Sequence, residues 1–533
     1  MRKNILALSI AAGLVAAGSA SANIISTETN AQTVAPTATQ LTPNVDGLGH
    51  ILIVPYFSAQ NGNSTLINLV NTDAVNGKAV KVRFRGASNS DDIFDFQVFL
   101  SPSDVWTANI SKVNGVATLT TTDKSCTLPS SVNQAFVLDR LPQTLSVADQ
   151  QKQTLEGYVE ILNMANIPPA RYALAQAGAT PTDGGNPLFQ ATVHSNGVPL
   201  CTATTMNRLE VDSLKMDDTT DTTNAAYQGL DFPSGGLYAN WTIINVPGST
   251  TWTGAASAIS AVTAGFVNGT GNLVMHPQTG DDVLDPQNRT SDPILTAGFL
   301  TISAAGVTGV AYDPALVPSM FDFPDLSTPY LPANVGAPDA QAVSITDSLA
   351  VTSVINEYLT DPTISGETDW VFSSPTRRYS VGMDYTTDPY TPVFQDLGLA
   401  APYFHSANVV VSDDTTQLCV KGVTPTAYDR EERTQQGNGF VISPGKKTIL
   451  TFCGEVSVLS FANSGTSVLG AELTRNNIVS GLYQDGWMAI ATPGNAGNGL
   501  PVIGASFMSA FNPAVSAGVA GNFGLTFPHR FVR

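Results

Sequence analysis

Four cysteines have the best-defined chemistry in this chain: Cys126, Cys201, Cys419 and Cys453. Their spacing is too wide for a CxxC redox motif or a zinc knuckle. In an oxidising compartment an even number of cysteines indicates disulfides, and four cysteines allow three connectivities. We predict the nearest-neighbour pairs, Cys126–Cys201 and Cys419–Cys453, because each bond then closes one domain-sized loop. Buried free thiols are the alternative.

Two clusters of aspartates are candidate ligands of a structural calcium ion. Ca²⁺ takes several oxygen ligands and is commonly held by acidic loops. Neither cluster follows the spacing of an EF-hand or of a calcium-binding β-helix repeat. No other cofactor is expected. The candidate ligands are Asp217, Asp218, Asp221, Asp281, Asp282 and Asp285.

No catalytic constellation is visible along the chain, and we predict neither catalytic nor cofactor-binding residues. The sequence lacks a GxSxG elbow, a Walker A loop and a dinucleotide-binding glycine fingerprint. A glycosidase needs two carboxylates about 5 or 6.5–9.5 Å apart, a separation that a sequence does not give. Structural roles are expected for the five scattered histidines, which are His50, His194, His276, His405 and His529.

The tryptophans could form a sugar-binding platform, because flat aromatic rings stack on pyranose faces. All of them except Trp252 lie in or beside strand-like segments, where packing in the core is the more common role of tryptophan. We therefore favour core positions over sugar binding for Trp106, Trp241, Trp370 and Trp487, while no strand signal surrounds Trp252.

The N-terminus is typical of a secretory signal peptide over residues 1–22. Arg2 and Lys3 precede an apolar run, and Ala20-Ser21-Ala22 offers the small side chains that signal peptidase accepts. We predict cleavage before Asn23, no transmembrane helix after cleavage, and an extracytoplasmic location: cell surface, secreted or periplasmic.

The composition is acidic but poor in charge. The formal net charge is −19, yet only 13% of residues are charged, against about 25% in an average domain. An acidic chain repels phosphate backbones, so nucleic acid is excluded as a partner. Low charge density of this kind recurs in bacterial surface-layer and filament proteins.

The elements that must position these residues are mostly strands. Residues 23–48 form an extended lead segment whose first residues could add to the sheet of a neighbouring molecule, and residues 49–135 form a first β-sandwich domain. Hydrophobic residues alternate with polar ones along Val80, Val82 and Phe84, and again at Phe94 and Phe96. The intervening Lys81, Arg83 and Arg85 predict a solvated strand face, paired with Asp92 and Asp95 across the sheet.

The rest of the chain divides into a loop-rich β region at 136–345 and a C-terminal β-rich domain at 346–533. One helix is expected from Asp347 to Leu359, where Val351, Val354, Ile355 and Tyr358 would line one face. Small residues dominate from Gly504 to Gly524. The predicted fold class is mainly β, with antiparallel β-sandwich (Ig-like) domains, long loops and few short helices.

Four segments resemble an uncharacterised family of secreted or cell-surface proteins of Gram-negative bacteria. They begin at Gly49 (GHILIVPY), Leu100 (LSPSDVWT), Thr368 (TDWVF) and Pro528 (PHR). The resemblance implies an extracytoplasmic protein, and it implies no activity and no functional residues.

Together these features predict a structural or adhesive cell-surface protein that self-associates into a surface layer or filament. A carbohydrate-binding or glycan-hydrolysing secreted protein is the alternative. The expected partners are copies of the chain, with a glycan or the outer-membrane surface as further candidates.

Overall fold

The computed structural model describes most of the chain from residue 37 onwards, with gaps, together with residues 22–24. The described ranges are 22–24, 37–170, 185–210, 228–265, 267–272, 274–275, 321–322, 331, 338–385, 388–394, 403–421, 425–434, 441–442, 446–447, 450–461, 467–479, 484–516 and 519–533. The protein is mainly β, and its sheets are antiparallel except for one parallel pair among the described strands, β28 with β29.

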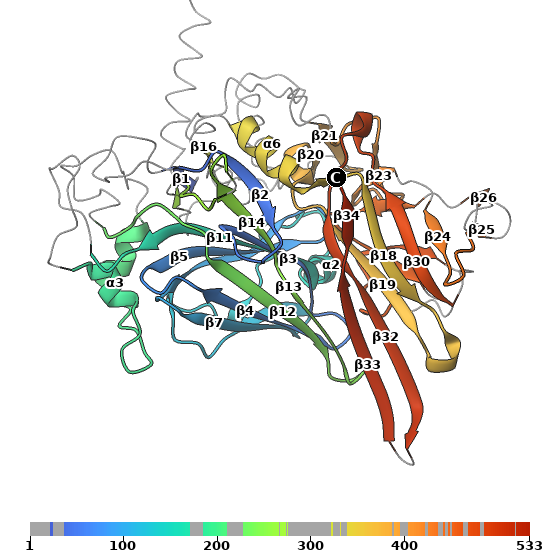
Figure 1. The fold of residues 1–533 in the computed structure, drawn as a ribbon, viewed down its shortest axis with the longest axis horizontal. Helices are drawn as coiled ribbons and strands as arrows, with labels where there is room; N and C mark the ends of the chain where they lie inside the picture. The colour runs from blue at the N-terminus through green and yellow to red at the C-terminus, as the bar shows by residue number, and fades with distance from the viewer. Residues whose placement is uncertain are drawn as a thin grey trace, which may run out of the picture.

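Two large sheets form the first sandwich (Figure 1). The seven-stranded sheet has the order β2-β14-β3-β11-β5-β6-β9, and the six-stranded sheet has the order β10-β8-β7-β4-β12-β13. The first set of strands is β2 (Gln40–Asn44), β3 (Ile51–Ser58), β5 (Gly77–Gly86), β6 (Asp92–Leu100), β9 (Cys126–Leu128), β11 (Glu156–Ile167) and β14 (Ser257–Val262). The second is β4 (Asn63–Asn71), β7 (Val105–Val113), β8 (Val116–Thr120), β10 (Gln134–Ala135), β12 (Leu237–Asn245) and β13 (Thr250–Ala255).

The core between these sheets follows the alternation in the sequence. Val80, Val82 and Phe84 of β5 are fully buried in it, as is Phe96 of β6, and Phe94 is 3% exposed. Strands β11 to β14, all beyond residue 135, belong to the same two sheets as the strands of 49–135. The first sandwich therefore continues on both sides of the boundary expected at residue 135.

The C-terminal part adds a five-stranded sheet with the order β29-β28-β19-β32-β33 and a four-stranded sheet with the order β24-β30-β18-β34. Their strands are β18 (Ser353–Leu359), β19 (Glu367–Ser373), β24 (Thr426–Tyr428), β28 (Val456–Phe461), β29 (Arg475–Val479), β30 (Asp485–Ala491), β32 (Ile503–Ser516), β33 (Val519–Pro528) and β34 (Arg530–Val532). A three-stranded sheet follows the order β22 (Val409–Val411), β23 (Leu418–Lys421) and β27 (Thr451–Cys453).

The five-stranded sheet is a shared middle layer. Trp370 and Phe461 on one of its faces belong to the C-terminal core, while Val371 and Phe507 on the other face belong to the core of the first sandwich. The Phe507 ring lies 5.6 Å from that of Trp241. Because both faces are covered, β28 is buried at every position, including Ser457 and Ser460.

The prediction of a helix from Asp347 to Leu359 is wrong. The helix α6 (Pro338–Leu349) lies earlier in the chain, and β18 (Ser353–Leu359) is a strand between β30 and β34. Val354 and Tyr358 are buried on the inner face of β18, where a period of two also places Asn356. Spacings of i and i+4 satisfy both periods, and β-branched residues in this segment favour the strand.

The remaining described elements are short. The helices are α2 (Val147–Gln153), α3 (Pro187–Thr192), α4 (Ala203–Met206), η1 (Asn207–Glu210), η5 (Pro362–Ile364), η6 (Arg377–Tyr379) and η7 (Asn495–Gly497). The strands are β1 (Ala22–Ile24), β15 (Val274–Met275), β16 (Phe321–Asp322), β17 (Ala350–Val351), β20 (Val381–Asp384), β21 (Thr391–Phe394), β25 (Val441–Ile442), β26 (Lys446–Lys447) and β31 (Leu500–Pro501). Within the described ranges, no helix is long and apolar enough to cross a membrane.

Candidate functional site

Both predicted disulfides are present. Cys126 is bonded to Cys201, and Cys419 is bonded to Cys453. Two disulfides fit folding in an oxidising, extracytoplasmic environment. The first bond joins β9 to the segment that leads into α4, and it lies beside a surface depression.

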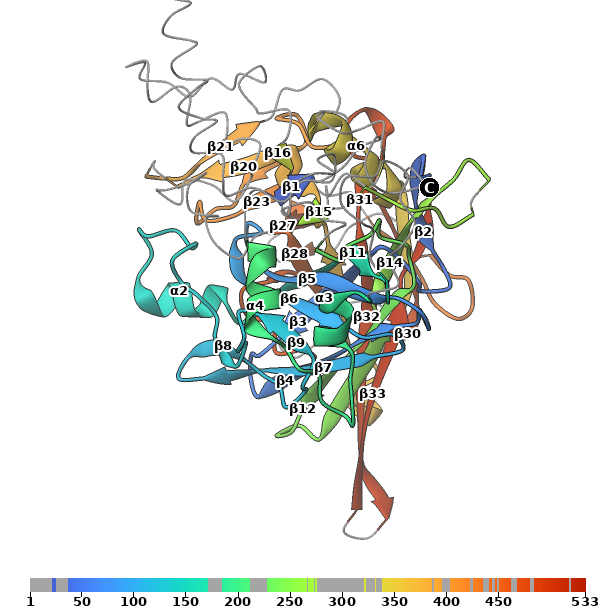
Figure 2. The same cartoon turned by 90° about the vertical axis from the view of Figure 1, so that its left-hand side faces the viewer.

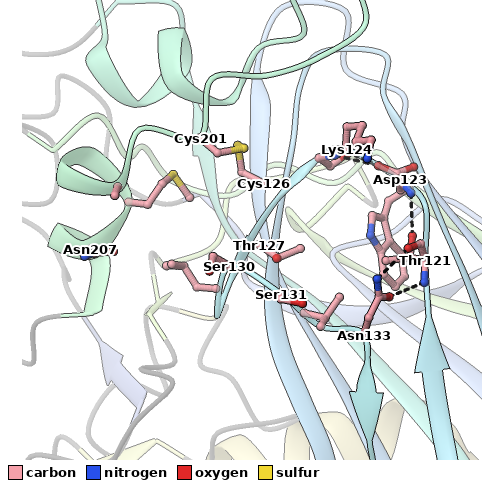
Figure 3. A pocket seen from close by; sticks show the side chains of 16 residues that line it. Thr121, Asp123, Lys124, Cys126, Thr127, Ser130, Ser131, Asn133, Cys201 and Asn207 are labelled. Atoms are coloured by element: carbon pink, nitrogen blue, oxygen red, sulfur yellow. Dashed lines mark hydrogen bonds between the residues drawn. A yellow bond between two sulfur atoms is a disulfide. The ribbon is translucent and has the colours of Figure 1, made fainter.

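This depression has a volume of about 480 Å³, and its lining combines hydroxyl and amide side chains with apolar ones and with the charged Asp123 and Lys124. Figure 3 shows Thr121, Asp123 and Asn133 on one wall and Asn207 on the other, with the Cys126–Cys201 disulfide between them. Asn133 is held by Thr121, whose backbone N–H donates to its Oδ1 at 2.6 Å. Asp123 is the one carboxylate among the lining residues described, so this lining does not hold the carboxylate pair of a glycosidase.

A serine, a histidine and an aspartate meet near the same region, but not as a catalytic triad. Ser101 Oγ lies 2.9 Å from His194 Nδ1, and Asp104 Oδ2 lies 3.4 Å from that same nitrogen. In a triad the aspartate contacts one ring nitrogen and the serine contacts the other, so that the ring can pass a proton between them. These contacts stabilise the turn at Ser101–Asp104. In the same turn the backbone N–H of Ser101 donates a hydrogen bond to Asp104 Oδ2.

The tryptophans fall into two groups. Trp106, Trp241 and Trp370 are buried as predicted, and Trp252 is buried as well. Trp487 is 39% exposed, and its ring stacks on that of Tyr428 at 4.2 Å across β30 and β24. In the stacked pair each ring covers one face of the other.

The basic stripe on β5 is not solvated, which corrects the sequence-based expectation. Lys81, Arg83 and Arg85 are buried, although Lys81 does pair with Asp95 at 2.5 Å and Arg83 with Asp92 at 3.1 Å, as predicted. At Arg85 the cover includes η6, because Glu160 lies 3.5 Å from Arg85 and 3.3 Å from Arg378 of η6. No local sequence pattern could have revealed a contact with so distant a segment.

The segment η6 contributes two further buried charges. Arg378 of η6 lies 3.3 Å from Glu160 of β11, and Arg377 lies 3.6 Å from Glu455. Burial raises the pKa of Glu455, although the two arginines beside it oppose that shift. Cations and carboxylates alternate in this buried layer, and their ion pairs connect the first sandwich to the C-terminal part.

The six aspartates predicted as calcium ligands, Asp217, Asp218, Asp221, Asp281, Asp282 and Asp285, lie outside the described residues. Among the residues that are described, no group of three or more His, Cys, Asp or Glu side chains could hold a metal ion.

The long hairpin β32–β33 is the most distinctive exposed feature. It extends beyond the first sandwich and the rest of the C-terminal part (Figures 1 and 2). Within the five-stranded sheet, β33 is the edge strand. Phe523, Leu525 and Phe527 lie on one face of β33 and are 55%, 52% and 38% exposed. Phe523 and Phe527 pair with Ala510 and Ser506 of β32, whose side chains are small, while Leu525 pairs with Met508.

The other face of the hairpin is held against the first sandwich. A Cβ added to Gly524 would lie 2.2 Å from the carbonyl oxygen of Thr251, so β13 approaches as closely as only glycine allows. Trp252 of β13 donates a hydrogen bond to the carbonyl of Met508 at 2.9 Å. One face of the hairpin therefore packs against the first sandwich, while Phe523, Leu525 and Phe527 on the other face are exposed to solvent.

Sequence reasoning noted the small residues from Gly504 to Gly524 but did not identify this surface. The signal that could have found it is charge: residues 486–528 contain no Asp, Glu, Lys or Arg. Alternating Phe523, Leu525 and Phe527 within that stretch predict an apolar strand face. That the face stays uncovered depends on tertiary structure.

Searches of protein-family models, of curated protein sequences and of solved structures each returned no match to this chain.

Proposed function

We propose that this chain is an extracytoplasmic structural protein whose copies self-associate through the hairpin β32–β33. The observation that carries the proposal is the exposed row of Phe523, Leu525 and Phe527 on an uncharged edge strand. An apolar edge strand is a ready template for pairing with another strand, and natural proteins usually protect such edges with charges or prolines. Here the protection is missing from most of β33.

The partner we propose is a second copy of the chain. Each copy carries a formal net charge of −19, so copies repel one another over most of their surface. Residues 486–528 lack charged side chains and can approach their equivalents without like-charge contacts. Antiparallel pairing of two β33 strands would also place Phe523 and Phe527 of both copies on one continuous face.

The expected strength is moderate. Full burial of a large apolar side chain stabilises by about 1.5–3 kcal/mol, and these three side chains are already about half buried. Their burial then contributes about 3 kcal/mol per copy, to which the backbone hydrogen bonds of the paired edges would add. Assembly should therefore depend on protein concentration. A surface layer or a filament would require a further contact besides this one.

Extracytoplasmic location is supported by the N-terminal segment, with Arg2, Lys3 and the apolar run after them, and by the two disulfides. The cell surface is the site we favour, because a self-associating structural protein acts there as part of a larger array.

The test is the oligomeric state of the chain beginning at Asn23, measured by sedimentation velocity over a range of concentrations. Leu525→Asp places a charge in the middle of the row and should shift the chain to monomer. Val113→Asp is the matched control, because Val113 is a 46% exposed strand residue of the six-stranded sheet. It should leave assembly unchanged, and circular dichroism would check that both variants fold.

A wild-type chain that stays monomeric at high concentration would overturn the proposal. If that monomer instead co-sediments with phospholipid vesicles and Leu525→Asp abolishes the binding, the hairpin is a membrane-binding element and the proposal also fails. Equal loss of assembly in Leu525→Asp and Val113→Asp would place the contact elsewhere.

Binding of a neutral glycan is a second candidate, favoured by the depression beside Cys126–Cys201. Its hydroxyl and amide side chains match the donors and acceptors of a sugar, and the disulfide holds its two walls together. A glycan array probed with the wild type and with Asn207→Ala would test it. Absence of binding, or binding that Asn207→Ala does not weaken, would argue against this site.

A further inference from the structure

A buried lysine lies beside an asparagine carboxamide in the first sandwich. Lys78 of β5 and Asn166 of β11 are direct partners in adjacent antiparallel strands. The Lys78 side chain is fully buried, and its Nζ lies 2.9 Å from Asn166 Oδ1. Buried lysines are rare and usually paired with a carboxylate, whereas the closest carboxylate oxygen here, Oδ2 of Asp73, is 3.9 Å away.

The surroundings increase the fraction of Lys78 present as the neutral amine, which is the nucleophilic form of lysine. The neighbours in sequence, Ala79 and Ile167, belong to a buried apolar cluster with Phe232. Desolvation lowers the pKa of Lys78 to about 8, although Asp73 opposes the shift. Lysine activated by desolvation is an established way of generating a nucleophile near neutral pH.

Ser234 contacts both reacting groups. Its backbone N–H points at Asn166 Oδ1 from 3.4 Å, where it can stabilise negative charge developing on that oxygen. Its hydroxyl oxygen accepts a hydrogen bond from Asn166 Nδ2 at 2.9 Å and lies 3.4 Å from Lys78 Nζ. One hydroxyl thus bridges the attacking nitrogen and the nitrogen that would leave.

We propose that Lys78 and Asn166 react to form an intramolecular isopeptide bond that joins β5 to β11. The lone pair of neutral Lys78 Nζ attacks Asn166 Cγ, a C–N bond forms, and the carbonyl π electrons move to Oδ1. A proton passes from Nζ through the Ser234 hydroxyl to Nδ2. The tetrahedral carbon then regains its carbonyl as the Cγ–Nδ2 bond breaks and ammonia leaves. No oxidant, reductant or co-reactant is consumed.

The competing arrangement is a stable ammonium group whose hydrogen bonds end on Asn166 Oδ1 and on the carbonyl and hydroxyl oxygens of Ser234. It predicts an unmodified lysine and an intact carboxamide. The two arrangements differ in covalent structure, so mass spectrometry separates them.

The experiment is intact-mass measurement of the wild-type chain, purified after export and denatured with its disulfides reduced. The isopeptide bond lowers the mass by about 17 Da, the mass of ammonia. Because a succinimide at any asparagine causes the same loss, the deciding result is a proteolytic fragment in which the Lys78 and Asn166 peptides are joined. Lys81, equally buried on β5 but paired with Asp95, is the internal control and should remain cleavable by trypsin.

Three variants complete the test. Asn166→Ala and Lys78→Met should retain the full calculated mass, while Asn163→Ala, which removes a neighbouring amide that also contacts Ser234, should still form the joined fragment. Ser234→Ala should form it more slowly. A wild-type chain of full mass with separate Lys78 and Asn166 peptides would overturn the proposal, whatever the variants do.

Discussion

Trp252 and Met508 are joined by a hydrogen bond from the indole Nε1 to the backbone carbonyl oxygen, at 2.9 Å and in a buried position. The two residues are separated by 256 positions in sequence. Trp252 belongs to β13 of the first sandwich and Met508 to β32 of the shared sheet, so this bond connects the two parts of the molecule.

Replacing Trp252 with Phe should lower the free energy of unfolding by about 1–3 kcal/mol, since the Met508 carbonyl is left buried without its donor. Denaturant titration would measure the change. A loss below about 0.5 kcal/mol would show that water or another donor replaces the indole.

The buried pair of Arg378 and Glu160 should be costly to break. Glu160→Gln leaves Arg378 without its full countercharge and should destabilise the fold by about 3–5 kcal/mol. The double variant Glu160→Gln/Arg378→Met should recover part of that loss. Asp149→Asn is the control, because Asp149 and Lys152 form an exposed pair whose removal should leave the unfolding midpoint unchanged.

His529 should make stability depend on pH. Its Nε2 bonds the Val371 carbonyl and its Nδ1 bonds Asn356 Nδ2, both at 2.9 Å, an arrangement that suits the neutral ring. Burial lowers its pKa to about 3. Since the unfolded chain binds this proton near pH 6.5, the stabilisation is fully present above that pH and is lost as pH falls towards 3.

His529→Gln should therefore flatten the decline in stability between pH 6.5 and 3. Comparing the variant with the wild type isolates this residue from buried acids such as Glu455, whose raised pKa has the opposite effect. Parallel stability curves for the two proteins would contradict the assignment.

Phe84 anchors the aromatic cluster of the first sandwich, with its ring 5.0 Å from that of Phe136. Truncation of Phe84 or Phe96 to Ala should cost about 3–5 kcal/mol, because each leaves a cavity in a closed core. Phe527→Ala, at an exposed position, is the control and should change stability far less. Losses below ~1 kcal/mol at Phe84 would mean that the strand register is inverted.

The two disulfides should stabilise unequally. Cys126–Cys201 closes a loop with a separation of 75 residues, and Cys419–Cys453 closes one of 34. Loop entropy alone makes removal of the first pair more costly, by about 0.7 kcal/mol. Paired Cys→Ser variants compared by thermal unfolding would test the order. The reverse order would show that native contacts outweigh loop length.

Much of the first sandwich could be predicted because its strands alternate. The alternation of Val80, Val82 and Phe84 with polar residues shows which face of the strand packs in the core. Hydrophobic alternation can be recognised without knowledge of distant residues. The cysteine pairing also followed from spacing and compartment. These features depend on local or one-dimensional information.

Other features depend on contacts that a sequence does not display. The segment from Val351 to Tyr358 satisfies helical and strand periods alike, and its pairing with β30 decides between them. Lys81 and Arg83 are charged residues of the kind expected on a solvent-exposed strand face, yet they lie buried beside their acidic partners. The exposed row on β33 is apolar by sequence, and among the described residues its side chains keep 38–55% of their surface exposed.

The shared middle sheet sets an order of events during synthesis. A ribosome delivers the first sandwich long before it delivers Phe507, whose ring fills the space beside Trp241 and Tyr56. The hydrophobic core of the N-terminal part therefore stays incomplete until nearly the whole chain has been made. A premature stop codon shortly before β32 would leave both cores incomplete, so late truncations should be as harmful to this protein as early ones.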